Sequence, residues 1–416
     1  MTPTGQFHLV TLGCPKNEVD SDKLAGTLVA DGMVPTDRVE DAELIVVNTC
    51  AFVEDARRES IDTVLALADE RQAGARLVVT GCMAERYGTE LADELPEVDQ
   101  VVGFGVPVVM GKTRSNGAPP PVMDLLNLPR PASTRPWAYV KVAEGCDRAC
   151  GYCAIPSFRG PQRSRSPESV LAEVDGLGVR EVVLVAQDLA AYGRDQGVGE
   201  KAIVALVGAV ADRVDWVRLL YLYPSEVTDP LVDAVCASGV PYFDLSLQHV
   251  SRPLLRRMRR WGDGDRFSAL VERIRRREPD ATFRSNFIVG YPGETEEDHD
   301  ELLAFVADAG LDWCGFFAFS EEVGTHAEGL DGAVAAPLVA ERLRELGELQ
   351  DAITASKRDA LIGRQVEVLV DEPGWGRTHR EAPEIDGLVE VPADLPVGEF
   401  ATLTVTGAAG PDLEAA

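Results

Sequence analysis

Residues 144–160, EGCDRACGYCAIPSFRG, carry three cysteines within eight residues, directly after the apolar run WAYVKV at 137–142. The cysteines have the spacing C-x3-C-x2-C and are Cys146, Cys150 and Cys153. A short apolar run bounded by turn residues is typical of a buried strand, and a barrel carries its chemistry on the loops that follow its strands. Cysteine thiolates hold iron–sulfur clusters, so we expect a cluster here. A zinc knuckle is the alternative, but it needs a fourth ligand, and no further Cys or His follows before Cys236.

This cysteine spacing, with Tyr152 before the third cysteine, resembles that of the radical S-adenosylmethionine superfamily. The resemblance implies a four-iron cluster whose open iron chelates S-adenosylmethionine, with Tyr152 as one of the residues that bind this cofactor. Gln187 and Gln248 end two later strand candidates, and either could hydrogen-bond the adenosyl group or be an ordinary polar strand end. Gly290 and Gly293 end another strand candidate, where glycine lets backbone approach a ligand closely.

Three further cysteines each follow a predicted parallel strand in the first part of the chain. The strand-end sequences are FHLVTLG before Cys14, LIVVNT before Cys50 and RLVVTG before Cys82. Ligands of open α/β sheets bind outside the carboxyl ends of the strands, so these three thiols can converge. They suit a second four-iron cluster with one open iron. The alternatives are packing residues or a structural zinc site, which is four-coordinate and has no obvious fourth ligand here.

The strand and helix signals predict three domains. Residues 1–115 alternate strands and amphipathic helices, as in a doubly wound α/β domain. The Gly/Pro-rich linker GKTRSNGAPPP follows, and residues 132–355 hold six βα units, short of the eight that close a barrel. We therefore expect an open (β/α)6 partial barrel, with a long helix that ends at Gly363. Residues 361–416 hold short β-like runs that predict a small β-barrel.

The chain has 416 residues and a formal net charge of −29. Such an acidic chain is a poor general nucleic-acid binder. The charge suits a basic protein partner, or it serves only to keep the chain in solution. We see neither an N-terminal signal nor an apolar run of ~20 residues that could span a membrane, and we expect a cytoplasmic protein. Cysteines there bind metal or react more often than they form disulfides. We interpret Cys236 and Cys314 as core residues.

The whole pattern resembles the radical S-adenosylmethionine methylthiotransferase family. The motifs LGCPKNEVDSD, VVNTCAFVEDA and VVTGCMAERY resemble its N-terminal cysteine motifs, and GRTHREAPEIDG resembles part of a TRAM domain. GCPKN, AQDLAAYGRD, LLYLYPSE, DLSLQHV and RGPQRSRS resemble the ribosomal, RimO-type branch. That resemblance implies methylthiolation of an aspartate β-carbon in the twelfth protein of the small ribosomal subunit. It also implies two 4Fe-4S clusters, S-adenosylmethionine, an external electron donor and a sulfur source.

Two other functions stay open at this point. The first is methylthiolation of a tRNA adenosine, but residues 361–416 hold three arginines and eleven acids, and an RNA-binding module should be basic. The second is a non-catalytic iron–sulfur or zinc scaffold that binds the ribosome, although a scaffold has no need for two sites that each lack a fourth ligand. We interpret the basic runs RRMRR (256–260) and RIRRR (273–277) as solvated faces or contacts to ribosomal RNA.

Overall fold

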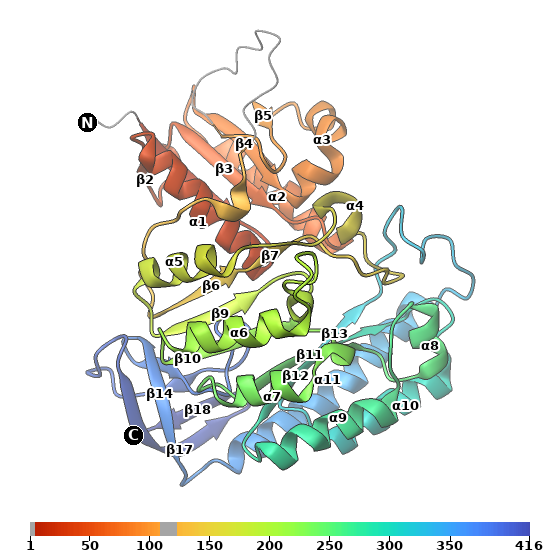
Figure 1. Ribbon diagram of the computed structural model, residues 1–416. Helices are drawn as coiled ribbons and strands as arrows, with labels where there is room; N and C mark the ends of the chain where they lie inside the picture. The colour runs from red at the N-terminus through yellow and green to blue at the C-terminus, as the bar shows by residue number, and fades with distance from the viewer. Residues whose placement is uncertain (1–4, 109–122) are drawn as a thin grey trace.

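The computed structural model describes residues 5–108 and 123–416, so the predicted Gly/Pro-rich linker lies outside the described residues. Three β-structures follow one another along the chain (Figure 1): an N-terminal sheet, a larger sheet in the middle and a small closed barrel at the end. The predicted α/β fold class is confirmed. The domain limits 1–115, 132–355 and 361–416 stay predictions.

Five parallel strands form the N-terminal sheet, in the order β2-β1-β3-β4-β5. Its elements are β1 (Gln6–Thr11), α1 (Pro15–Ala30), β2 (Val34–Pro35), β3 (Leu44–Thr49), α2 (Glu54–Glu70), β4 (Arg76–Gly81), α3 (Cys82–Glu94) and β5 (Gln100–Val101). In β3, Ile45 and Val47 face the core under α2, whereas Leu44 and Val46 face the core under α1. Because both faces are covered, residues 44–47 of this strand are an unbroken apolar run. The sheet is doubly wound, and the strand order reverses between β1 and β3.

Six parallel strands form the middle sheet, in the order β13-β12-β11-β10-β9-β6, which leaves it open between β6 and β13. We call it the open barrel. Its strands are β6 (Trp137–Lys141), β9 (Glu181–Val185), β10 (Trp216–Leu222), β11 (Tyr242–Gln248), β12 (Thr282–Val289) and β13 (Trp313–Ala318). Its helices are α4 (Ile155–Arg159), α5 (Pro167–Leu177), α6 (Glu200–Ala211), α7 (Asp229–Cys236), α8 (Arg252–Arg257), α9 (Gly264–Arg277), α10 (Glu296–Ala309) and α11 (Ala336–Asp359). The predicted (β/α)6 arrangement is confirmed.

Several short elements complete this part of the chain. A two-stranded ribbon, β7 (Ala143–Glu144) with β8 (Arg163–Ser164), brackets the cysteine loop after β6. Single 3-10 turns lie at Val39–Asp41, Leu125–Asn127, Leu189–Ala191 and Pro224–Glu226. No helix in the described ranges is long and apolar enough to cross a membrane.

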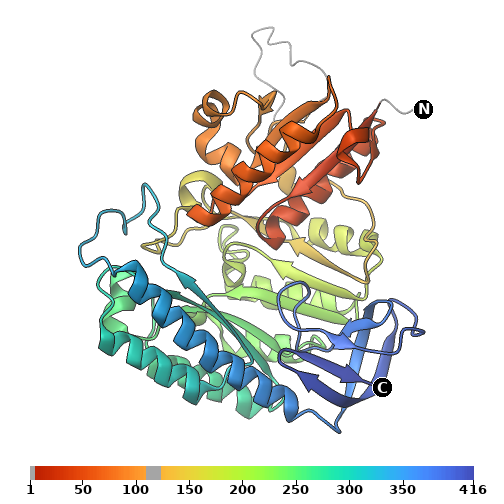
Figure 2. The same ribbon diagram turned by 180° about the vertical axis from the view of Figure 1, so that it is seen from behind.

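Helix α11 leads along the outside of the open barrel to the last barrel (Figure 2). It ends at Asp359 rather than at the predicted Gly363. The chain turns there because the Gly363 N–H donates to the Val405 carbonyl, at 2.8 Å, and so joins the next unit. That unit is a closed barrel in the order β14-β15-β16-β18-β17. Its strands are β14 (Gln365–Glu372), β15 (Trp375–Arg377), β16 (Val389–Glu390), β17 (Phe400–Ala409) and β18 (Asp412–Ala415).

One segment of the C-terminal barrel, residues 376–387, packs against the amino ends of the open-barrel strands. Arg377 donates to Glu181 at 2.7 Å, Tyr242 donates to Asp386 at 2.6 Å, and Trp313 donates to the Arg380 carbonyl at 2.7 Å. Glu181, Tyr242 and Trp313 are the first residues of β9, β11 and β13. This segment therefore covers the end of the open barrel opposite to the cysteine loop.

Two candidate cysteine sites

The first candidate site lies at the switch point of the N-terminal sheet. Cys14 stands between β1 and α1, Cys50 directly follows β3, and Cys82 opens α3 after β4. All three follow the carboxyl ends of neighbouring parallel strands, as the sequence predicts. We call this group the N-terminal cysteine set.

Two glycines allow the loops of this set to pack closely. Gly13 has φ +94°, and a Cβ there would lie 2.9 Å from the Cys50 Sγ. Gly81 has φ +91°, and a Cβ there would lie 2.6 Å from the backbone N and O of Thr49. Each glycine therefore meets two requirements at once, a left-handed backbone and the absence of a side chain.

Asn17, at the start of α1, ties the same loops together. Its Nδ2 donates to the Leu12 carbonyl at 2.9 Å and to the Thr49 carbonyl at 3.1 Å. The Cys82 Sγ lies 3.6 Å from the Asn17 Oδ1. One buried amide thus reaches all three cysteine loops.

The three thiols differ in their electrostatic surroundings. Burial raises the pKa of Cys14, but the Lys16 ammonium, the Arg159 guanidinium and nearby backbone N–H groups outweigh it, so this pKa lies below its usual value. Burial raises the pKa of Cys50 to about 12, and it raises the pKa of Cys82 despite the neighbouring Arg159. A ligated sulfur must be deprotonated, and Arg159 favours the thiolate at all three positions.

The second candidate site is the loop after β6 and β7, which holds the barrel cysteine set: Cys146, Cys150 and Cys153. Burial raises the pKa of Cys146 to about 11 and that of Cys153 to about 12. Backbone and side-chain N–H groups face the sulfurs of this set. The backbone N–H of Arg148 donates to Cys146 at 3.4 Å, and the Arg260 Nη1 donates to Cys150 at 3.3 Å.

The two arginines beside the barrel set share one aromatic ring. Arg148 lies 3.9 Å from the centre of the Tyr223 ring, and Arg260 lies 4.3 Å from it. Arg260 is buried, which corrects the interpretation of RRMRR as a solvated face or an RNA contact for this one residue. Arg256 and Arg259 of the same run are exposed, and for them the interpretation stays a prediction. The run RIRRR does lie at the surface, where Arg277 pairs with Asp229 and Asp233.

The predicted S-adenosylmethionine contacts lie in different surroundings. Gln187 donates to Glu144 at 2.7 Å, and its buried Oε1 has no hydrogen-bond partner among the described residues. Gln248 ends β11 in a left-handed conformation, with φ +72°. Tyr152 is half-buried, and burial raises its pKa well above the usual value. The contacts of all three with the cofactor stay predictions.

Gly290 and Gly293 meet protein rather than open space. A Cβ at Gly290 would lie 2.5 Å from a methyl group of Val339 on α11. A Cβ at Gly293 would lie 3.2 Å from the guanidinium of Arg257. Close packing is sufficient to explain both glycines, and their contact with the cofactor stays a prediction.

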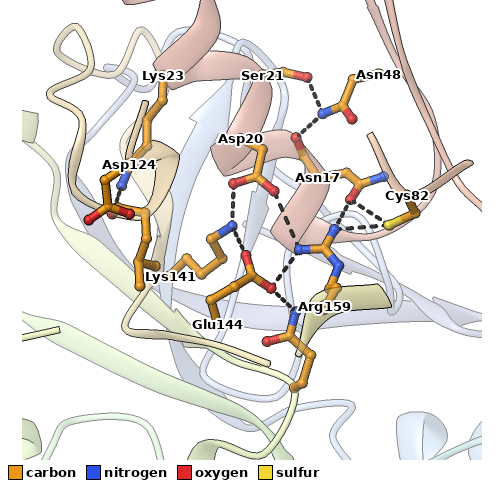
Figure 3. A network of polar contacts seen from close by, with 12 residues as sticks. Asn17, Asp20, Ser21, Lys23, Asn48, Cys82, Asp124, Lys141, Glu144 and Arg159 are labelled. Carbon is orange, nitrogen blue, oxygen red and sulfur yellow. Dashed lines mark hydrogen bonds and ion pairs between the residues drawn. The ribbon is translucent and has the colours of Figure 1, made fainter. Parts of the chain in front are cut away.

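Arg159, the last residue of α4, is a site residue that we did not predict. Its side chain leaves the barrel cysteine loop and reaches the N-terminal cysteine set, where Nη2 donates to the Cys82 Sγ at 2.9 Å (Figure 3). The signal was present, because Arg159 stands only six residues after Cys153 in the same motif. Nothing in the sequence shows which cysteine set it faces.

The donor chemistry fits iron–sulfur clusters at both sites. Each set offers three thiols, the ligand that such clusters use, together with a buried guanidinium hydrogen-bonded to one sulfur. Among residues 5–108 and 123–416, no three His, Cys, Asp or Glu side chains stand around a position for a single metal ion.

Three protein families match successive parts of the chain. Residues 6–103 match the uncharacterized protein family UPF0004, residues 140–306 the radical SAM superfamily and residues 362–416 the TRAM domain. The protein called ribosomal protein uS12 methylthiotransferase RimO in Kineococcus radiotolerans is 43% identical, over 97% of this chain and 96% of its own. Its namesake in Moorella thermoacetica is also 43% identical, over 96% of each chain.

The chain belongs to the RimO family of radical S-adenosylmethionine methylthiotransferases. A solved structure adds a likeness of fold alone: the cobalamin-dependent S-adenosylmethionine radical enzyme OxsB has a TM-score of 0.51 at 11% identity. The likeness covers 84% of this chain and 56% of the OxsB chain. As a RimO-family member the chain is a radical S-adenosylmethionine enzyme, and that superfamily implies a 4Fe-4S cluster and S-adenosylmethionine as cofactors.

Proposed function

We propose that this enzyme transfers a methylthio group to the β-carbon of an aspartate in ribosomal protein uS12, with two four-iron clusters. One observation carries the proposal: two three-thiol sets lie at the carboxyl ends of two parallel sheets, and Arg159 of one loop contacts a thiol of the other set. The relatives named above carry uS12 in their names.

The barrel set would hold the cluster that binds S-adenosylmethionine. When bound, these groups supply the radical that removes hydrogen from an unactivated carbon, since the cofactor carries the hard chemistry. The chain supplies position and charge. Arg260 and the Arg148 backbone donate to two of the sulfurs, and the Ala327 N–H holds the Gly151 carbonyl inside the cysteine loop, at 2.8 Å.

The N-terminal set would hold the second cluster. Its three thiols come from three loops that Asn17 joins, so the set can keep its shape while one iron stays open to an external sulfur. An external electron donor and a sulfur source belong to this proposal.

The C-terminal barrel supports a protein substrate over tRNA. Of its three arginines, Arg377 is 1% exposed and pairs with Glu181 and Asp371. Arg380 pairs with Asp280. Phosphate binding depends on cationic side chains that are free to contact phosphate. Arg377 and Arg380 are already paired with acids where the C-terminal barrel meets the open barrel.

The first test is a mass spectrum. We would reconstitute the full chain without oxygen, add S-adenosylmethionine and a low-potential reductant, and offer small ribosomal subunits and undermodified tRNA together. We expect a methylthio adduct on uS12 and none on tRNA. An adduct on tRNA alone would keep the chemistry and overturn the substrate.

A variant separates the two clusters. Cys50→Ala should leave cleavage of S-adenosylmethionine within about twofold of the parent, because the barrel set is intact, and should abolish methylthiolation. Cys236→Ala, at the end of α7 and outside both sets, should keep both activities. If Cys50→Ala still transfers a methylthio group, the two-cluster proposal is wrong.

A further inference from the structure

Arg159 crosses between the two parts of the molecule that carry cysteines. It ends α4, six residues after the last cysteine of the barrel set, yet its guanidinium lies among residues of the N-terminal sheet. Its side chain is 1% exposed, and its guanidinium stacks 4.5 Å from the centre of the Phe104 ring. Such a buried charge needs several partners.

The two terminal nitrogens of the Arg159 guanidinium have different hydrogen-bond partners. Nη1 donates to Glu144, from the ribbon that brackets the barrel cysteine loop, at 2.8 Å. Nη2 donates to the Cys82 Sγ at 2.9 Å and to the Asn17 Oδ1 at 2.8 Å. Figure 3 shows the guanidinium with Glu144 on one side and Asn17 and Cys82 on the other.

Asn17 extends this contact to the other two cysteine loops. Its Oδ1 accepts from Arg159, while its Nδ2 donates to the Leu12 carbonyl, two residues before Cys14, and to the Thr49 carbonyl, directly before Cys50. Arg159 thus contacts one cysteine itself and fixes the amide that holds the loops of the other two.

Glu144, the partner of Arg159 beside the barrel cysteine loop, is itself held by further hydrogen bonds. Glu144 also accepts from Lys141 at 2.7 Å and from Gln187 at 2.7 Å. Lys141 in turn pairs with Asp20 on α1, whose other oxygen lies 3.6 Å from Arg159. Two buried cations, Lys141 and Arg159, therefore share two acids, the buried Asp20 and the half-buried Glu144, and these ion pairs link the open barrel to α1.

We propose that Arg159 is a positioning residue for the N-terminal cysteine set, which locks that set to the barrel cysteine loop and tunes its cluster through the Cys82 sulfur. The inference rests on the proposed second cluster. A hydrogen bond to a ligand sulfur is one of the factors that set the reduction potential of an iron–sulfur cluster. The donor stabilises the more negative, reduced form, so its loss lowers the potential.

The geometry requires arginine rather than lysine. A planar fork can donate to a carboxylate and to a sulfur at the same time, whereas an ammonium is a compact point charge on a flexible stem. Arg159→Lys therefore keeps the charge and loses one of the two contacts.

The test isolates the N-terminal cluster in the full chain. In a Cys146→Ala/Cys150→Ala/Cys153→Ala background only the N-terminal set can bind a cluster, so iron content and a potential titration followed by electron paramagnetic resonance report on it alone. We expect Arg159→Lys to keep most of the iron and to move the midpoint potential to a more negative value. Arg260→Lys makes the same change at the buried arginine beside the other set, whose sulfurs this background lacks, so it is the matched control and should leave that potential unchanged.

A second variant guards against misfolding. The double variant Arg159→Met/Glu144→Gln removes the cation and neutralises its carboxylate partner at the same time. Neither member of this pair is then left as an unpaired charge. We expect the double variant to shift the midpoint potential in the same direction as Arg159→Lys. Unchanged potentials in both variants, with iron retained, would overturn the role of Arg159 and leave the two clusters standing. A background protein that binds no iron would overturn the second cluster itself, and the inference with it.

Discussion

At the scale of single residues, each cysteine set has one buried guanidinium hydrogen-bonded to a sulfur. Arg159 donates a hydrogen bond to the Cys82 sulfur, and Arg260 donates one to the Cys150 sulfur. The strand-end rule predicts where the cysteines lie, because it needs only the order of strands in the chain. It cannot predict these arginines, since each reaches its sulfur from another segment: Arg260 is 110 residues from Cys150 in sequence.

Gly81, directly before Cys82, gives a prediction at this scale. Gly81→Ala would bring a Cβ to 2.6 Å from backbone atoms of Thr49 and force alanine into a left-handed conformation. Gly74→Ala is the matched control, because Gly74 has φ +92° and no atom of the described residues would lie within 4 Å of the added Cβ. The control isolates the backbone strain, about 1–2 kcal/mol. We expect Gly81→Ala to lower the free energy of unfolding, measured in urea, clearly more than Gly74→Ala does. We also expect it to lower the amount of iron bound by the N-terminal cysteine set. Equal costs would show that the loops relax around the new methyl group.

At the scale of elements, the apolar runs predict the parallel strands well and the C-terminal barrel less completely. The strands β3 and β9 are fully buried and largely apolar, so hydrophobicity alone indicates them. β15 and β18 span three and four residues. Strands this short are set by pairing partners elsewhere in the chain, such as β14 for β15, which the local sequence does not show.

The segment between β13 and α11, residues 319–335, is an element of another kind, which we call the strap. Its Glu322 is 2% exposed and accepts from Arg57 of α2 at 2.6 Å and from Arg86 of α3 at 2.7 Å. The strap also donates from Ala327 to the Gly151 carbonyl of the barrel cysteine loop. It therefore joins the N-terminal helices to the barrel cysteine set.

Glu322→Gln tests this connection. The variant keeps the shape of the side chain but loses the charge that two arginines share, and a hydrogen bond to a charged group contributes about 1.5–3 kcal/mol. We expect faster hydrogen exchange across the strap and along the first turns of α2. Glu321→Gln is the control, since Glu321 is exposed and, within the described part of the chain, accepts a hydrogen bond from the Gly329 backbone alone, at 2.9 Å. Unchanged exchange in Glu322→Gln would show that backbone contacts alone hold the strap.

At the scale of the whole molecule, the acidic chain joins its parts through buried ion pairs. Glu181 of the open barrel binds Arg218 of its neighbouring strand at 2.8 Å and Arg377 of the C-terminal barrel at 2.7 Å. Burial raises the pKa of Glu181, but the two guanidinium groups outweigh it and hold the pKa below its usual value. The net charge of −29 predicts the avoidance of nucleic acid but not these junctions, because they depend on a few charges of opposite sign that fold together.

Another junction brings two acids together. Glu18 of α1, Arg135 before β6 and Glu384 of the C-terminal barrel meet, with Arg135 lying 3.2 Å from Glu18 and 2.7 Å from Glu384. Burial and the neighbouring Glu384 carboxylate raise the pKa of Glu18 to about 7, although Arg135 opposes the shift and Asp22 adds to it. The junction therefore titrates near neutral pH.

This raised pKa makes the junction sensitive to pH in a definite direction. The pKa of a glutamate in an unfolded chain is about 4.3. Between about pH 4.3 and 7 the folded chain therefore holds the Glu18 proton more tightly than the unfolded chain does. The resulting stability is complete below the unfolded pKa and is lost as the pH rises through about 7. Glu18→Gln cannot ionise, so we expect its melting temperature to exceed that of the parent at pH 8 by more than it does at pH 5. Glu59→Gln, exposed on α2, corrects for the general gain from removing one negative charge. The difference in melting temperature between Glu18→Gln and the parent could instead stay constant from pH 5 to pH 8, or Glu59→Gln could reproduce it. Either result would mean that Glu18 is ionised in the folded chain throughout this range and that Arg135 outweighs both burial and Glu384.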